Sequence, residues 1–207
     1  MHAVPHKHFI MHKPYGHLSQ FVCELKKKKL LGSFYNFPTG TMAIGRLDED
    51  SEGLLFLTTD GRMSEFIRSS EIEKEYYAQV DGLIREDAIA RLQQGVEIGI
   101  RNVKYQTQSC RAFLLTKDPG FAERTRKIRD DRHGPTSWIS ITLTEGKERQ
   151  VRKMTAAVGF PTLRLVRVRI GKIFLGELKP GEVREVDNFV EEQNILSHAQ
   201  INITTAL

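Results

Sequence analysis

The sequence predicts an α+β fold with a mixed, largely antiparallel sheet flanked by helices. Segments with strand patterns outnumber those with helical patterns, and many links between them are too short for repeated strand–helix–strand crossovers. Hydrophobic residues make up 40% of the chain and charged residues 28%, an ordinary globular balance. A chain of 207 residues can form one large domain or two small lobes that share a cleft.

The first half of the chain predicts two strands and a helix. Phe9–Met11 has the composition of a short strand, and Lys13-Pro14-Tyr15-Gly16 ends it as a turn. The apolar run Leu54–Thr58 has strand length and predicts burial on both faces. After the turn at Asp60-Gly61, apolar residues recur with helical spacing and predict a helix. They are Met63, Phe66 and Ile67.

Three further strands are expected in the second half. The alternation in Lys74–Val80 places Lys74, Tyr76, Ala78 and Val80 on one face. Trp138–Thr144 alternates in the same way. In Leu165–Ile170 the valines and the final isoleucine face one side, and Arg167 and Arg169 are expected to be exposed on the other.

Two helices and a long loop complete the second half. Arg85–Gln94 predicts a short helix closed by Gly95 as its C-terminal cap. Glu148–Val158 predicts another, with Val151, Met154 and Val158 as its buried stripe. The polar, arginine-rich segment Lys117–Pro135 is bounded by Gly and Pro and predicts a loop.

The distribution of charge favours a polyanionic partner. The net charge is only +5, but residues 145–172 contain eight Lys or Arg and two Glu, whereas residues 182–207 contain one Arg and five acids. A segregated positive surface suits a nucleic acid better than a small neutral substrate. There is no apolar run long enough to span a membrane and no visible secretory signal. With only two cysteines, the expected location is the reducing cytoplasm.

The densest cluster of acids lies in the stretch Gly45–Gly53. It contains Asp48, Glu49, Asp50 and Glu52, directly before an apolar strand. A carboxylate at the start of a buried strand must be paired or must titrate at a raised pKa. The residues alone leave open a hydrolase carboxylate pair or a magnesium site, whereas the spacing of a calcium-binding EF-hand is absent.

Four motifs in one order resemble a known family. They are Lys13-Pro14-x-Gly16, then Gly45-Arg46-Leu47-Asp48 with the following Gly53–Gly61, then Lys74-x-Tyr76, and finally Glu145–Met154. Together they resemble the ribosomal pseudouridine synthases of the small-subunit-synthase family. The short chain and the tract Gly159–Leu165 resemble its branch acting on large-subunit rRNA, typified by synthase E. The resemblance implies a pseudouridine synthase fold, with two lobes around a central cleft.

The resemblance also implies roles for individual residues. Asp48 would be the catalytic carboxylate, acting as nucleophile or base, and Arg152 would pair with it and lower its pKa. Tyr76 would pack against the uracil ring, and Arg46 would fill the gap left by the extruded nucleotide. Further RNA contacts are expected from Lys13, Lys74, Lys147, Arg149, Arg167 and Arg169. Glu49, Asp50 and Glu52 would be turn or solvent carboxylates.

The remaining expectations concern organisation and partners. Residues 1–8 are expected to form an N-terminal extension, 9–190 the catalytic domain and 191–207 an acidic or polar tail. The expected partner is ribosomal RNA of the large subunit, and the protein is expected to act as a monomer. No membrane association, metal ion or cofactor is expected. Five histidines lie within the first 17 residues, but their spacing matches no structural zinc pattern, so a polar extension is expected there.

Overall fold

The computed structural model describes residues 5–25, 27–69, 71–128 and 131–189, which form two compact units. Unit 1 is drawn from residues 1–72 and 168–207, and unit 2 is residues 73–167. The predicted tail 191–207 and the first four residues of the predicted extension lie outside the described residues.

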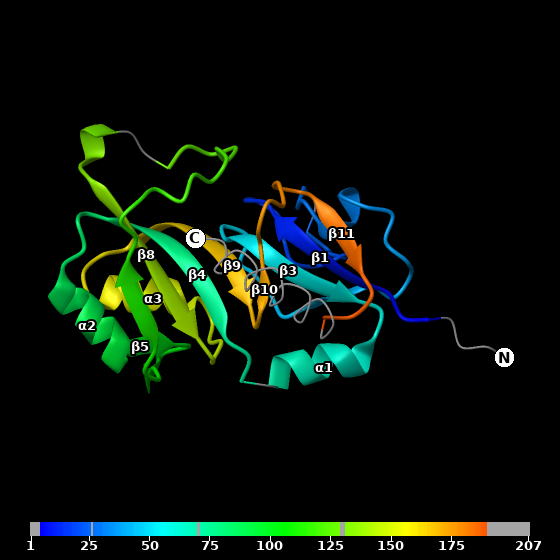
Figure 1. The fold of residues 1–207 in the computed structure, drawn as a ribbon, viewed down its shortest axis with the longest axis horizontal. Helices are drawn as coiled ribbons and strands as arrows, with labels where there is room; N and C mark the ends of the chain where they lie inside the picture. The colour runs from blue at the N-terminus through cyan, green and yellow to red at the C-terminus, as the bar shows by residue number, and fades with distance from the viewer. Residues whose placement is uncertain (1–4, 26, 70, 129–130, 190–207) are drawn as a thin grey trace, which may run out of the picture. The chain divides into compact units, whose positions relative to one another are not determined.

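In its described residues, unit 1 combines a small antiparallel sheet with helix α1 (Figure 1). Its central strands run in the order β11-β1-β3, β2 pairs with β3, and β10 pairs with the end of β9. Helix α1 contacts β2 and β3. The elements are β1 (His8–Lys13), η1 (Leu31–Ser33), β2 (Met42–Ile44), β3 (Glu52–Thr58), α1 (Gly61–Ser69), β10 (Ile173–Phe174) and β11 (Val183–Val186). Strand β9 (Thr162–Ile170) contributes residues 162–167 to unit 2 and its last three residues to unit 1.

The core of unit 1 forms around β3, all of whose residues are buried. This confirms the strand predicted at Leu54–Thr58 and extends it to Glu52. Phe9 and Met11 of β1 pack with Leu55 and Leu57 of β3, and the Phe56 ring stacks on another aromatic ring of the unit. Burial of this many large apolar side chains is the main term that stabilises the unit.

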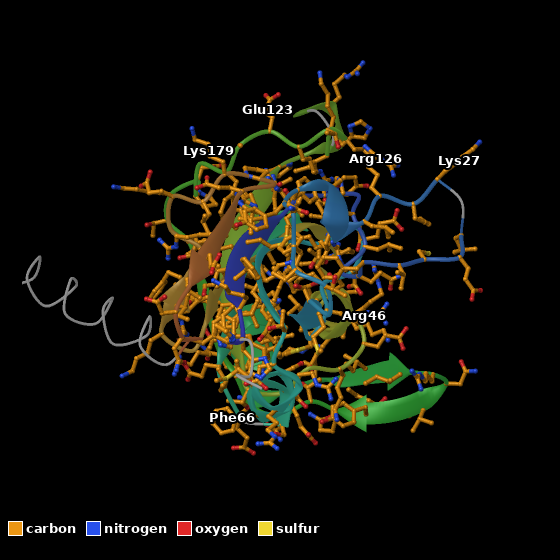
Figure 2. The ribbon with its side chains drawn as sticks, turned by 90° about the vertical axis from the view of Figure 1, so that its right-hand side faces the viewer. Lys27, Arg46, Phe66, Glu123, Arg126 and Lys179 are labelled. Carbon is orange, nitrogen blue, oxygen red and sulfur yellow. The ribbon has the colours of Figure 1, made fainter. Side chains whose placement is uncertain are left out.

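Helix α1 begins where the sequence predicts. The Asp60 carboxylate accepts the backbone N–H groups of Arg62 and Met63 at 2.8 and 3.3 Å, so it satisfies two donors at the helix start. Ile67 faces the core, whereas Phe66 is 59% exposed and points outward from the helix (Figure 2). The helical spacing thus predicted the element correctly, although only part of its apolar set is buried.

Unit 2 combines a larger antiparallel sheet with two helices (Figure 1). Strand order is β9-β4-β8-β7, and β5 and β6 form a separate hairpin. Ala78 and Val80 of β4 pack in one core with Leu92 of α2 and Met154 of α3. The elements are β4 (Lys74–Asp81), α2 (Glu86–Gln94), β5 (Glu97–Ile100), β6 (Val103–Gln106), β7 (Arg111–Leu114), η2 (Asp131–His133), β8 (Thr136–Leu143) and α3 (Gln150–Ala157).

The predicted α+β class and the mostly antiparallel sheet are confirmed. The predicted loop Lys117–Pro135 has only the short turn η2 as regular structure among its described residues. Helix α3 starts two residues later than predicted, because Arg149 adopts a left-handed backbone (φ 52°) just before it. Within the described part of the chain, no helix has the length and apolar character needed to cross a membrane.

The expectation that Arg167 is exposed was wrong. Only 4% of its surface is accessible, although it alternates with the apolar residues of β9 as the sequence suggests. Alternation assigns residues to two faces of a strand, but it does not show that the polar face meets solvent. In this strand both faces are covered.

We predict that Gly95→Ala destabilises the protein by about 2–4 kcal/mol, because its backbone lies in a region that only glycine adopts readily. Gly95 ends α2 with φ 88° and ψ 150°, and an added Cβ would lie 2.3 Å from the Thr107 carbonyl oxygen. Urea denaturation measures the change. Gly99→Ala is the matched control, since a Cβ there meets nothing within 4 Å; equal stability of the two variants would contradict the prediction.

Candidate active site

In unit 1, the acidic residues form a tight turn between β2 and β3. The backbone N–H of Ser51 donates to the Asp48 carbonyl at 3.0 Å, which closes the turn, and the N–H of Gly16 donates to the Glu49 carbonyl at 2.8 Å. Leu47 is buried and Asp48 is half-buried. Arg46, labelled in Figure 2, is exposed. The turn therefore leaves the Arg46 and Asp48 side chains partly accessible on a fixed backbone.

Lys13 lies inside unit 1, contrary to its expected place at the RNA. Its surface is 0% exposed, and its Nζ donates to the carbonyls of Ser51 at 2.7 Å and Pro14 at 3.1 Å. Burial lowers the pKa of Lys13 to about 8, although the carboxylates of the acidic turn oppose this shift by favouring the cation. Lys13 therefore anchors the end of the acidic turn and does not reach a phosphate group.

The four acids of the turn differ in their surroundings. The Glu49 carboxylate accepts from Lys28 Nζ at 2.7 Å near the surface, and Asp50 is half-buried. Glu52, expected to be a turn or solvent carboxylate, is 1% exposed at the first residue of β3. The expectation was wrong for Glu52 because the strand, and with it the buried face, begins two residues earlier than its apolar run.

In unit 2, β4 presents an aromatic ring beside a cation. Tyr76 is half-buried against the core of its unit, and the Arg167 guanidinium lies 6.0 Å from the centroid of its ring. Lys74 is half-buried and donates from Nζ to the Thr144 carbonyl at 3.3 Å. Burial and the nearby Arg167 charge lower the pKa of Lys74. Arg167, also expected at the RNA, is thus placed as an internal support for the ring.

The other predicted basic residues are more accessible. Arg152 is half-buried on α3, where its Nη1 donates to the Thr162 carbonyl at 3.2 Å. Lys147 and Arg149 are exposed just before α3, and Lys147 Nζ lies 4.9 Å from the centroid of the Tyr105 ring. Arg169, in unit 1, is half-buried and donates to the Gly171 carbonyl at 2.6 Å.

Glu145, for which the sequence predicted no individual role, holds the segment that leads into α3. Its carboxylate accepts hydrogen bonds from the Tyr105 hydroxyl, the Gln108 backbone N–H at 2.9 Å and the Gln150 side-chain amide. The bond to Glu145 raises the pKa of Tyr105. Gln150 in turn accepts the N–H of Lys147 at 2.9 Å. The sequence contained a signal for this role, because Glu145 is the first residue of the motif Glu145–Met154 that also contains Arg152.

The histidines near the start of the chain make internal hydrogen bonds. The Nδ1 atoms of His8, His12 and His17 lie 2.9, 2.8 and 3.1 Å from Thr58 Oγ1, the Leu178 carbonyl and the Tyr15 carbonyl, respectively. His8 and His12 are buried in β1, where the sequence predicted a polar extension for this region. Among the described residues, no three His, Cys, Asp or Glu side chains gather as a metal site would require.

The family model of the RNA pseudouridylate synthases matches residues 7–157. The match covers the acidic turn, β4 and the whole of α3, the elements that carry Asp48, Tyr76 and Arg152. This chain belongs to the RNA pseudouridine synthase family. It is therefore an isomerase, as the resemblance of its four motifs predicted.

Individual proteins agree with the family model. A protein of Vibrio parahaemolyticus serotype O3:K6 named ribosomal large subunit pseudouridine synthase E is 41% identical over 182 residues, covering 87% of this chain and 74% of the relative. One of that name from Xanthomonas campestris pv. campestris is 39% identical and covers 86% of this chain and 94% of the relative. A crystal structure described as pseudouridylate synthase aligns with a TM-score of 0.72 and 26% identity, over 95% of this chain and 76% of that one.

Because the pKa of Lys13 is lowered in the fold, the free energy of unfolding should depend on pH in a predictable direction. Its pKa is about 8 in the fold against an ordinary 10.5, so the unfolded chain binds the extra proton between these values. Stability should rise with pH across that window, by at most about 1.4 kcal/mol per pH unit. Other lysines titrate there too, so the difference in unfolding free energy between wild type and Lys13→Met is the measured quantity. It should grow from pH 8 to pH 10; a constant difference would refute this assignment.

Proposed function

We propose that this synthase converts a specific uridine of large-subunit ribosomal RNA to pseudouridine, acting as a monomer with Asp48 as the catalytic carboxylate. The proposed substrate is supported by sequence similarity: four proteins named ribosomal large subunit pseudouridine synthase E are 38–41% identical to this chain. The observation that favours Asp48 is its place on a rigid, partly accessible turn next to the exposed Arg46.

The reaction is an isomerisation, so its atoms balance without an oxidant or co-reactant. The bond between ribose C1′ and uracil N1 breaks, the uracil turns, and a bond forms between C1′ and C5. The proton on C5 is lost, and N1 gains one. The Asp48 carboxylate would either attack the sugar as a nucleophile or remove a proton from it as a base, and both roles require the ionised form.

The surroundings of Glu49 and Glu52 support Asp48 over these two neighbours. Glu49 already pairs with Lys28, and Glu52 is buried at the start of β3. We propose that the guanidinium of Arg152 pairs with Asp48 in the reaction and orients it, as a fork of donors does for a carboxylate. Tyr76 would stack on the uracil and tolerate its rotation, because stacking has no strict direction in the ring plane.

Positive residues on the surface would supply the affinity for the RNA backbone. Arg46, Lys147 and Arg149 are exposed, and the loop between β7 and β8 adds exposed Arg126 and Lys127. Contacts of this kind release counterions, so binding should weaken as salt increases. Because an enzyme that acts on a paired base must extrude it, Arg46 would occupy the space that the nucleotide leaves.

The proposal predicts that Asp48→Asn lowers the rate of pseudouridine formation by at least about 10²-fold, the scale of a lost acid–base or nucleophilic group. Asp50→Asn is the matched control: it makes the same change two residues away and should retain most of the activity. The measurement maps pseudouridine in ribosomal RNA from cells lacking the protein and complemented with each variant.

Two outcomes of this mapping would contradict the proposal. An unchanged pseudouridine map in the deletion strain would show that the substrate is not this RNA. Full restoration of the modification by Asp48→Asn would show that another group performs the chemistry. If only growth or ribosome assembly were restored and no site depended on the protein, it would act as an RNA-binding assembly factor.

A second prediction concerns the ring on β4. Tyr76→Leu should lose about 1–3 kcal/mol of stacking, a reduction of roughly 5- to 150-fold in kcat/KM, whereas Tyr76→Phe keeps the ring face. Kinetics on a ribosomal RNA fragment give the values, and thermal unfolding checks that both variants are folded. A Tyr76→Phe variant as impaired as Tyr76→Leu would assign the effect to the hydroxyl and refute the stacking role.

A further inference from the structure

Ser19 lies in the loop after β1 and is 7% exposed. Its hydroxyl makes two hydrogen bonds with one residue of the acidic turn. Oγ accepts the backbone N–H of Leu47 at 2.9 Å and donates to the Leu47 carbonyl at 2.8 Å. A hydroxyl can donate and accept at the same time, so one small side chain satisfies both polar groups of this residue.

These two bonds fix the chain immediately before Asp48. The Leu47 N–H belongs to the peptide that joins Arg46 to Leu47, and the Leu47 carbonyl belongs to the peptide that joins Leu47 to Asp48. Because a peptide group is planar, orienting its N–H or carbonyl orients the whole unit. Ser19 therefore sets the peptide plane from which the Asp48 side chain projects.

The loop that carries Ser19 is itself held on both sides. Leu18 donates its N–H to the Lys29 carbonyl at 2.9 Å, and the Gln20 carbonyl accepts from Leu31 N–H at 3.2 Å. Leu47 contributes its own anchor, since its side chain is only 6% exposed. A rigid support of this kind keeps a reacting group in its productive position.

We propose that Ser19 is a positioning residue for the isomerisation, acting through the backbone of Leu47 on the orientation of Asp48. The proposal rests on the function proposed above for Asp48. It requires no contact between Ser19 and the RNA, because the serine is buried within unit 1. Its effect is therefore on the chemical step and not on the affinity for substrate.

The test is the steady-state kinetics of Ser19→Ala on a ribosomal RNA fragment, compared with wild type. Small displacements of a catalytic group can cost up to 10²-fold in rate, so kcat should fall by about 10- to 100-fold. KM should change by less than about threefold, because binding contacts remain. Ser19→Cys keeps a weak donor and acceptor in a side chain of similar shape, and its kcat should lie between those of Ser19→Ala and wild type.

Ser33→Ala is the matched control. Ser33 is exposed, and its hydroxyl likewise donates to a carbonyl, that of Leu30 at 3.0 Å, so this variant should retain the wild-type kcat. Hydrogen exchange provides a readout that does not depend on activity: the Leu47 amide should exchange faster in Ser19→Ala than in wild type.

A folded Ser19→Ala variant with wild-type kcat would overturn the inference, as would a loss confined to KM. If Ser19→Ala fails to fold, Ser19→Cys decides: a kcat loss of about threefold or more at unchanged KM supports positioning, and wild-type kcat rejects it. Asp48→Asn separates this inference from the proposed function. Should Asp48→Asn remain active, the function proposed for Asp48 fails; should it be inactive while Ser19→Ala is fully active, only the role of Ser19 fails.

Discussion

The hydrogen bonds of the buried Lys13 side chain are the contact on which the acidic turn depends. Several carboxylates lie within a few residues of one another beside this side chain, and their charges offset part of the cost of burying the Lys13 cation. The hydrogen bond from Lys13 to the Ser51 carbonyl ties the side chain to the backbone at the end of the turn. A lysine suits this place because it provides a compact charge at the end of a slender apolar stem.

In unit 2, an anion holds a functional segment in place in a comparable way. Glu145 accepts hydrogen bonds from Tyr105 of β6, from the Gln108 backbone just after β6 and from Gln150 of α3, so one carboxylate defines how α3 begins. The helix can then carry Arg152 on a fixed face. In each unit, an internal charge with several hydrogen bonds supports the residue proposed to act on the RNA. A network of this kind stabilises the fold only when every polar group in it has a hydrogen-bond partner, since a buried polar group without one destabilises the folded state.

The sequence predicted the fold and the family well, because strand alternation, capping residues and an ordered set of motifs are all local signals. The same reasoning failed for Lys13, Glu52 and Arg167, which it assigned to solvent or RNA. Each is a charged residue placed by a motif or by strand alternation, and neither signal shows whether the side chain is buried. Burial depends on which distant segments cover a strand, and so do the contacts of Ser19 with Leu47, 28 residues away in sequence. The pairing of Asp48 with Arg152 stays a prediction.

The pairing of β1 with β3 has a consequence for how the active site could be lost or altered. Lys13 stands opposite Gly53 in that antiparallel ladder, and the register of β1 thereby determines where the ammonium meets the turn that ends at Ser51. A slip by one residue would shift the side chain by about 3.4 Å along the strand and exchange the two faces of β1. Insertions or deletions within β1 should therefore be far less tolerable than substitutions, since strand alignment here determines electrostatics as well as packing.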